Sequence, residues 1–384
     1  MVYLDAAATT KPKKEVVEAM LPYFNDKWRN PSALYSGATD IKKDIEQARK
    51  TVGDFINAKG NEIFFTSSGS ESNNWVIQGF VNRCNRLGLF PTVITSTIEH
   101  KSILYCVENI NADVYYINVD NKGFIKMDML EDILKFVSSE NYENKAILVS
   151  LQYANNEIGT IQPIKTLTAL AHKYNAIVHT DAVQVFGQMP IDVKELDVDL
   201  MSASGHKIHA LKGSGFLYKK DGIKIDPLIY GSQMDELRGG TENVPYIMGL
   251  SKAVELCDVS HKKVEELRDK RNYFINLLKF EFDCKLNGSN NNRLRLPNNI
   301  NVTFPQNITG ESLLYTLDLS GVQVATGSAC NSHSITPSYV LKNVGLSNDD
   351  AMKTIRFTLP NDITYEEIDN VIAEIKKSIK LIEM

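Results

Sequence analysis

The chain has 384 residues, of which 43% are hydrophobic and 23% are charged, and its formal net charge is −5. This length allows two or three domains and can bury a large apolar core without metal ions or disulfides. The acidic balance argues against the concentrated basic face of a nucleic-acid-binding protein, so we expect no direct nucleic-acid partner.

Neither a signal peptide nor a membrane span is expected. The N-terminus lacks a charged segment followed by an apolar one, and no run of about 18 apolar residues occurs. The five cysteines are widely spaced and form no C-x-x-C pair: Cys84, Cys106, Cys257, Cys284 and Cys330. This spacing argues against a disulfide framework and against a thiolate-rich metal site. We therefore expect a cytoplasmic protein without a metal.

Short apolar runs alternate with helix-length amphipathic stretches from about residue 15 to residue 255. The predicted strands are 63–66, 92–96, 146–151, 176–180 and 199–202, and a helix is expected over 164–174 after Pro163. This alternation predicts an α/β fold with a mainly parallel central sheet covered by helices. Ligands bind beyond the carboxyl ends of the strands in such sheets, so polar residues after each strand are the candidate site.

The pattern changes after residue 257. A charged helix is predicted over 261–278, a half-buried strand over 299–304 and an amphipathic helix over 365–382. These elements predict a smaller α+β domain. We expect a large domain over 13–257, and a small domain formed by 1–12 together with 258–384, which carries Cys330.

Two turns that follow predicted strands carry residues suited to ligand binding, one for an anion and one for an aldehyde. The hydroxyl-rich turn after Thr66 contains Gly69 and Ser70 and opens a helix, which suits a phosphate, although serines that cap a helix would give the same pattern. Lys207 lies among small residues after a strand, where loss of water would make its amine a nucleophile for an aldehyde. An ordinary surface lysine is the alternative for this position.

Two further side chains leave strands. Asp181 follows a hydrophobic strand, and a buried carboxylate there would need a cation such as a pyridinium, unless it caps the next helix. His100 follows another strand, where its ring could stack on a planar cofactor, transfer protons, or be purely structural.

Cys330 differs from the other cysteines in its surroundings. It lies in a Gly- and Ser-rich stretch, Ala325–Ser332, which favours an exposed, mobile loop over a packed core. The other cysteines lie in helix-like, apolar or otherwise unremarkable stretches and are expected to behave as small hydrophobic residues. Cys330 is therefore the predicted reactive thiol.

Together these segments resemble the NifS/IscS-type cysteine desulfurases, which are class V aminotransferase-like enzymes of pyridoxal-phosphate (PLP) fold type I. The resemblance extends from Tyr3 to Phe357. The motifs that carry it are Asn30–Ser32, Phe65–Ser67 with Glu71–Asn73, Glu99–Lys101, Asn155–Gly159, His179–Asp181, Ser204–Lys207 and Gly327–Cys330.

The resemblance implies a role for each residue that matches a family motif. It implies that Lys207 binds PLP covalently and moves protons, that Asp181 pairs with the pyridine nitrogen, and that His100 stacks on the ring. Gln184 would hydrogen-bond the ring hydroxyl, and Asn156 would lie beside cofactor and substrate.

The remaining implied roles concern the phosphate and the substrate. The phosphate ligands would be Gly69, Ser70, Ser204 and His206. Thr241 would reach the phosphate of the neighbouring subunit in a homodimer. Arg356 would bind the substrate carboxylate, which suits a planar bidentate donor.

The activity implied by this resemblance is conversion of L-cysteine to L-alanine with transfer of the sulfur to Cys330 as a persulfide. The sulfur would then pass to an acceptor protein, either an iron–sulfur scaffold or a tRNA-thiolating enzyme. One alternative is a selenocysteine lyase, or a related PLP lyase that does not need Cys330. Another is a non-catalytic sulfur-assembly partner that has kept the fold.

Overall fold

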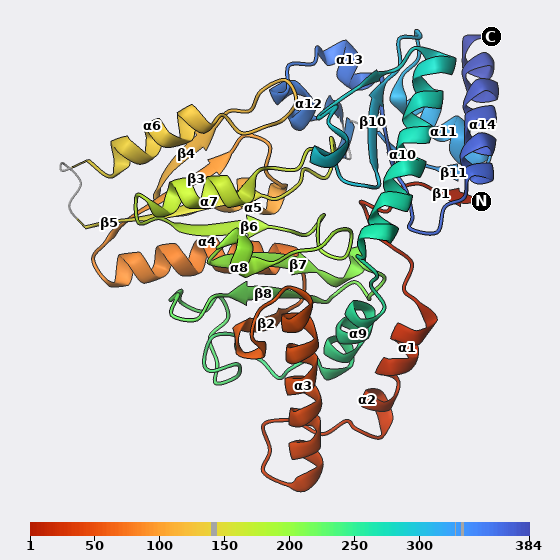
Figure 1. Cartoon of the computed structure of the whole chain (residues 1–384). Coiled ribbons are helices and arrows are strands. Elements are labelled where there is room, and N and C mark those ends of the chain that lie inside the picture. The colour runs from red at the N-terminus through yellow and green to blue at the C-terminus, as the bar shows by residue number, and fades with distance from the viewer. Residues whose placement is uncertain (140–143, 327, 332–333) are drawn as a thin grey trace.

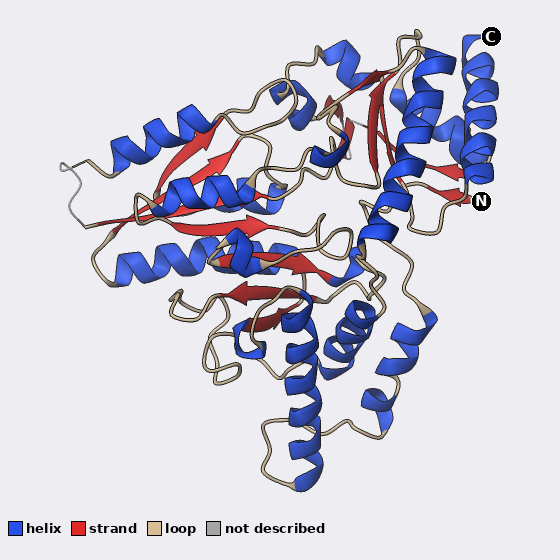
Figure 2. Cartoon of the chain, in the orientation of Figure 1, coloured by secondary structure: helices blue, strands red, loops and turns tan. Residues whose placement is uncertain are grey.

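The computed structural model describes residues 1–139, 144–326, 328–331 and 334–384, without the side chains of 328–331, 334 and 335. Figures 1 and 2 show a large central sheet with helices beside it and a second, smaller sheet next to a group of helices that includes the C-terminus. The predicted α/β class with a mostly parallel central sheet is confirmed.

Seven strands of the described chain form the large sheet in the order β2-β8-β7-β6-β5-β3-β4. Their bounds are β2 Ile63–Thr66, β3 Phe90–Ser96, β4 Asp113–Ile117, β5 Lys145–Gln152, β6 Ile177–Asp181, β7 Leu200–Ser204 and β8 Gly215–Lys219. β8 runs antiparallel to both of its neighbours, while β3–β7 are mutually parallel where they pair. The link between β7 and β8, residues 205–214, is too short for a helical crossover, so β8 returns in the opposite direction.

Helices and short turns accompany this sheet. They are α1 Lys14–Met20, α2 Pro22–Asn25, α3 Ser36–Phe55, η1 Gly60–Glu62, α4 Gly69–Arg86, α5 Lys101–Val107, α6 Met127–Val137, α7 Ile164–His172, α8 Val193–Leu196, η2 Gly205–Lys207 and α9 Val244–Glu255. α4 packs across most of the sheet, and its fully buried Trp75 meets Phe64 of β2 edge to face at 5.9 Å between ring centroids. The N-terminus of α4 is thereby fixed at the carboxyl edge of the sheet.

The second sheet is antiparallel, with strand order β12-β15-β10-β9. The bounds in this part are β1 Val2–Tyr3, α10 His261–Phe282, β9 Lys285–Leu286, η3 Asn292–Leu294, β10 Asn299–Thr303, α11 Gly310–Leu319, β11 Val322–Gln323, β12 Ala325–Thr326, β13 Ser328–Asn331, β14 Ser334–Pro337, α12 Tyr339–Asn343, α13 Asn348–Met352, β15 Thr354–Thr358 and α14 Tyr365–Glu383. β1 pairs with β11, so the N-terminus lies beside this part of the chain (Figure 1).

Buried apolar side chains form two clusters in the described residues. The first surrounds the large sheet, and the second joins Leu4 to residues between Leu267 and Ile379. Val340 and Leu341 of α12 belong to the first cluster although they come late in the sequence. The division into two domains near residue 257 stays a prediction, and the two clusters are compatible with it.

The backbone around Cys330 differs from the expected loop. β13 and β14 pair antiparallel, with Cys330 opposite Ile335. Ile335 and Thr336 of β14 are β-branched residues, which favour strands, whereas the expectation of a loop rested on the Gly- and Ser-rich composition. The Cys330 side chain itself lies outside the described residues.

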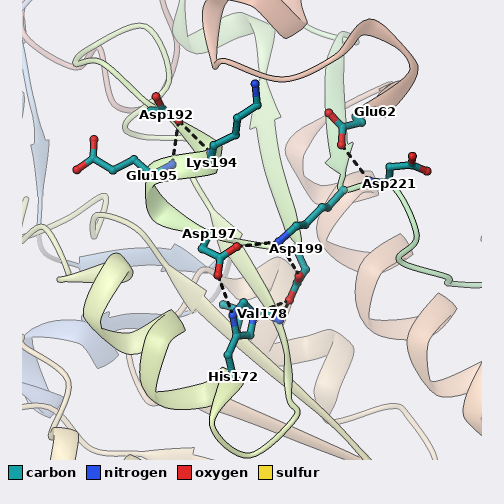
Figure 3. A network of polar contacts seen from close by, with 10 residues as sticks. Glu62, His172, Val178, Asp192, Lys194, Glu195, Asp197, Asp199 and Asp221 are labelled. Atoms are coloured by element: carbon teal, nitrogen blue, oxygen red, sulfur yellow. Dashed lines mark hydrogen bonds and ion pairs between the residues drawn. The ribbon is translucent and has the colours of Figure 1, made fainter.

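A network of polar contacts lies at the edge of the sheet opposite the carboxyl ends of the parallel strands (Figure 3). His172 at the end of α7 lies 3.2 Å from Asp197 and 3.0 Å from Asp199, and Lys220 lies 2.7 Å from Asp197. Asp199 also accepts the Val178 backbone N–H at 2.8 Å. These contacts connect α7 to the start of β6 and lie away from the carboxyl edge.

Within the described ranges, no helix has the length and apolar character to cross a membrane.

Gly79 of α4 generates a test of this packing. A Cβ on Gly79 would lie 2.4 Å from the Asp226 carbonyl oxygen, which also accepts a hydrogen bond from Trp75 at 3.0 Å. We predict that Gly79→Ala lowers stability by about 1–3 kcal/mol, because the clash outweighs the helix propensity gained by alanine. Thermal unfolding should show a midpoint several degrees lower.

The matched control is Asn82→Ala at an exposed position of the same helix. It should leave the unfolding midpoint unchanged or raise it slightly, since alanine favours helix. A Gly79→Ala protein as stable as the Asn82→Ala protein would show that the close approach of α4 to residue 226 is wrong.

Candidate active site

A cavity of about 380 Å³ opens at the carboxyl edge of the large sheet. Ten predicted site residues line it: Gly69, Ser70, His100, Asn156, Asp181, Gln184, Ser204, His206, Lys207 and Arg356. They lie at the ends of β6 and β7, in the segments that follow β2, β3, β5, β6 and β7, and in β15. The rule that ligands bind beyond strand ends therefore located this cavity.

Of the other two predicted site residues, Thr241 does not line the cavity, and the side chain of Cys330 lies outside the described residues. Thr241 is exposed in the segment before α9. Cys330 is described only as part of the β13 backbone. Their predicted roles, a contact with a second subunit and a transferable thiol, stay predictions.

Asp181 ends β6 at the floor of the cavity with 3% of its surface exposed. Its Oδ2 accepts a hydrogen bond from Asn73 Nδ2 at 2.8 Å, and its Oδ1 accepts one from the Val183 N–H at 3.0 Å. In the described chain, no Lys, Arg or His nitrogen lies within 4.0 Å of it. A buried carboxylate oriented by neutral donors and lacking a cation is suited to a positively charged ligand atom.

The N-terminus of α4 forms one wall. Ser68 caps the helix by accepting the Glu71 N–H at 3.1 Å, and the next two residues, Gly69 and Ser70, line the cavity. A Cβ on Gly69 would lie 2.5 Å from Val183 Cγ2, so only glycine fits this approach. Ser204 Oγ is buried and has no partner among the described residues. A helix N-terminus beside a free hydroxyl is suited to bind phosphate.

Lys207 extends from η2 toward the N-terminal segment. Its Nζ donates to the carbonyl oxygens of Ala7 at 2.5 Å and Ala8 at 2.7 Å. Burial and, to a lesser extent, the nearby Arg356 lower the pKa of Lys207 to about 8, against smaller opposing effects of Asp5 and Asp181. A substantial fraction of the molecules therefore carries Lys207 as a neutral, nucleophilic amine slightly above neutral pH.

The two histidines of the cavity are held neutral. Burial lowers the pKa of His206 to about 4, aided by the charges of Lys207 and Lys212. Burial also lowers the pKa of His100, whose Nδ1 accepts the Ser102 N–H at 3.1 Å and lies 2.8 Å from Ser102 Oγ. Occupation of Nδ1 by these bonds fixes the ring orientation and leaves Nε2 for a ligand.

Arg356 of β15 also lines the cavity. Its Nη1 donates to the Asn156 carbonyl oxygen at 3.1 Å, and its Nη2 pairs with Asp5 at 2.6 Å. The Nε is buried without a partner in the described chain. Asp5 and Asn156 thus hold the guanidinium in one orientation, with donor capacity left for a ligand carboxylate.

Several contacts at the site were not predicted from the sequence. Asn73 lies four residues after Gly69 and therefore on the same face of α4, a spacing that could have indicated it. Gln152 ends β5 beside Asn156, 3.3 Å from its side chain, and follows the strand-end rule. The carbonyl groups of Ala7 and Ala8 carry no such signal, because their contact with Lys207 spans about two hundred residues of sequence.

Comparisons of this chain with protein families, known sequences and solved structures agree with one another. The family model described as aminotransferase class-V matches residues 2–371. Proteins named cysteine desulfurase IscS from Dictyoglomus turgidum and Clostridium botulinum are 43% and 42% identical, and each alignment covers 99% of this chain and 94% of the relative. A solved NifS-like protein superposes with a TM-score of 0.89 at 32% identity over 99% of both chains. A structure described as SspA in complex with cysteine has a TM-score of 0.80 at 34% identity, over 94% of this chain and 99% of that one.

The Lys207 pKa generates a test on the cofactor-free protein. Formaldehyde with cyanoborohydride methylates only neutral amines, and mass spectrometry reports the rate at each lysine. Because burial disfavours the ammonium form, Lys207 should lose its proton as the pH rises through about 8. We predict a half-maximal rate near pH 8, whereas an ordinary lysine titrates near 10.4. A half-maximal rate above pH 10 would contradict this burial.

Proposed function

The chain belongs to the aminotransferase class-V family, and from this premise we propose a function for its cavity. The protein is a cysteine desulfurase that mobilises sulfur from L-cysteine, in line with relatives 42–43% identical over nearly the whole chain. The observation that carries the proposal is the buried Asp181 carboxylate, which faces the cavity without a cationic partner in the described chain. It calls for a cationic ligand atom beside a lysine amine.

The cavity fits PLP by the chemistry of its donors. Asp181 would face the ring nitrogen, and Lys207 would bind the aldehyde. Ser204 Oγ, buried and unpaired, would bind the phosphate. Three further phosphate ligands are proposed at the α4 N-terminus and in η2: Gly69, Ser70 and His206.

The rest of the proposed cofactor site follows from side chains around the ring. His100 would stack on it, Gln184 would bind its hydroxyl, and Asn156 would lie beside cofactor and substrate. When bound, PLP supplies an electron sink for the electrons left on the substrate α-carbon. Asp181 supports this by stabilising a protonated ring nitrogen, and each pKa unit of that stabilisation amounts to about 1.4 kcal/mol.

Arg356 and Lys207 would handle the substrate. The Arg356 guanidinium, held by Asp5 and Asn156, binds the carboxylate of cysteine through its unpaired Nε. Lys207, whose amine is partly neutral near pH 8, takes the α-proton and later returns a proton to the carbon. Both side chains are partly withdrawn from water, which strengthens their charge interactions.

Cys330 would receive the sulfur. Its thiolate attacks the substrate sulfur, a sulfur–sulfur bond forms, and the carbon–sulfur bond of cysteine breaks. The carbon that loses the sulfur takes a proton, so that alanine leaves and Cys330 carries a persulfide. The position of Cys330 in the short antiparallel β13–β14 pair supports a carrier that also meets an acceptor protein.

We propose a cytoplasmic homodimer as the working form, with Thr241 reaching the phosphate of the neighbouring subunit. Large exposed apolar side chains between α2 and α3, among them Trp28 and Leu34, support a contact with another chain. The sulfur acceptor would be an iron–sulfur scaffold or a tRNA-thiolating enzyme.

Alanine and sulfide release from L-cysteine with a reductant tests the function. Wild type should produce both. Cys330→Ala and Lys207→Ala should each lose at least about 100-fold, because each removes a group that touches reacting atoms. The Cys330→Ala protein should keep its yellow cofactor, which shows that only sulfur transfer is lost.

Other outcomes identify the alternatives. A Cys330→Ala protein with full activity would indicate a selenocysteine lyase or related PLP lyase that does not use the thiol. A colourless wild type that takes up no PLP would indicate a non-catalytic partner. Full activity of Lys207→Ala would contradict PLP chemistry at this cavity.

A further inference from the structure

The end of the Cys330 strand pair is attached to the wall of the cavity. Ser338 directly follows β14 and is 5% exposed. Its hydroxyl donates a hydrogen bond to the Glu157 carboxylate and accepts the N–H groups of Val340 and Leu341 at 3.1 and 3.3 Å. Glu157 follows Asn156, whose carbonyl oxygen accepts the bond from Arg356. One hydroxyl therefore joins the end of β14, the start of α12 and the turn beside the Arg356 guanidinium.

The next residue makes a second attachment. The Tyr339 hydroxyl donates to the Glu99 carbonyl oxygen at 2.5 Å. Glu99 precedes His100, and its own side chain is buried, with Oε1 2.5 Å from Ser96 Oγ. Burial raises the pKa of Glu99 to about 8 and also raises the pKa of Glu157. Both attachments thus lie in a water-poor region, where a lost hydrogen bond leaves an unpaired polar group.

α12 belongs structurally to the large sheet, whereas β12 belongs to the small one. Val340 and Leu341 are fully buried in the cluster of the large sheet. At the other end, Ala325 of β12 pairs with Arg356 of β15. The strands that carry Cys330 are therefore held between two parts of the protein that both line the cavity.

We propose that Ser338 and Tyr339 are positioning residues for sulfur transfer. Through Glu157 and Glu99 they fix the end of the β13–β14 pair relative to Asn156 and His100, and so set where Cys330 meets the substrate sulfur. The inference rests on the proposed cysteine desulfurase function. Transfer between two sulfur atoms needs close approach, and a shift of about 1 Å can cost a reaction 100-fold.

Tyr339→Phe tests this in the holoenzyme. It removes one hydroxyl and keeps the ring, so the rate of alanine formation in a single turnover, with enzyme in excess, should fall roughly threefold to tenfold. The absorbance change of the bound cofactor on adding cysteine should keep its amplitude and half-saturating concentration. This split separates a transfer defect from a general structural defect.

Two comparisons sharpen the test. Tyr365→Phe removes a hydroxyl from an exposed tyrosine at the start of α14 and should leave the rate unchanged. Ser338→Ala should slow alanine formation to a similar degree, and Ser338→Thr, which keeps a hydroxyl and a helix cap, should restore most of it.

The failures are distinguishable. A wild type that forms no alanine from cysteine refutes the proposed function, and the inference fails with it. An active wild type with an equally fast Tyr339→Phe variant overturns the inference alone. Loss of cofactor binding, or a changed half-saturating concentration, in Tyr339→Phe would also overturn it, because the hydroxyl would then shape the cofactor site.

Discussion

A single buried carboxylate is the constraint on which the cavity depends. Asp181 is withdrawn from water at the end of β6, and its two oxygen atoms are oriented by Asn73 and by the Val183 N–H. An isolated buried charge is costly unless a cation meets it. The described chain brings none within 4.0 Å, so the cation must arrive with a ligand. The parallel strands then bring an amine, a phosphate-binding helix end and a guanidinium to the same edge.

Burial changes the protonation of the basic groups around this carboxylate. It makes the Lys207 amine more easily neutral and keeps His206 uncharged, since both pKa values are lowered chiefly by loss of water. The Arg356 guanidinium is held in place by its ion pair with Asp5. The cavity thus combines an available nucleophile with a fixed positive group for an anionic substrate, which a water-filled site could not maintain.

The sequence predicted the parts of the fold that local pattern controls. β5, β6 and α7 lie within one or two residues of their expected bounds, because their periodicity matches one element type. The ten cavity residues were found through strand ends and family motifs. The reversal of β8 was not predicted, since strand direction depends on what the connection can span.

Contacts between segments far apart in the chain could not be predicted from the sequence either. The Ala7 and Ala8 carbonyl groups reach Lys207 only because β1 pairs with β11 and so fixes the N-terminus beside the small sheet. The attachment of Tyr339 to Glu99 joins residues 240 positions apart. The Cys330 segment was expected as a loop because its composition is that of a turn, but a short antiparallel ladder forms there. Backbone pairing of this kind depends on both strands together and not on either composition alone.

Replacement of the buried charge by an isostere tests the central claim most directly. Asp181→Asn keeps an acceptor for Asn73 but removes the negative charge, and the rate of alanine formation by the PLP-loaded protein is the measurement. The account predicts a fall of roughly 100-fold, as expected when a buried charge-assisted hydrogen bond is lost. Asp120→Asn is the control, because the exposed Asp120 also accepts backbone N–H groups but does not line the site cavity, and it should retain full activity. An Asp181→Asn protein within threefold of wild type would contradict the claim that this charge organises the site.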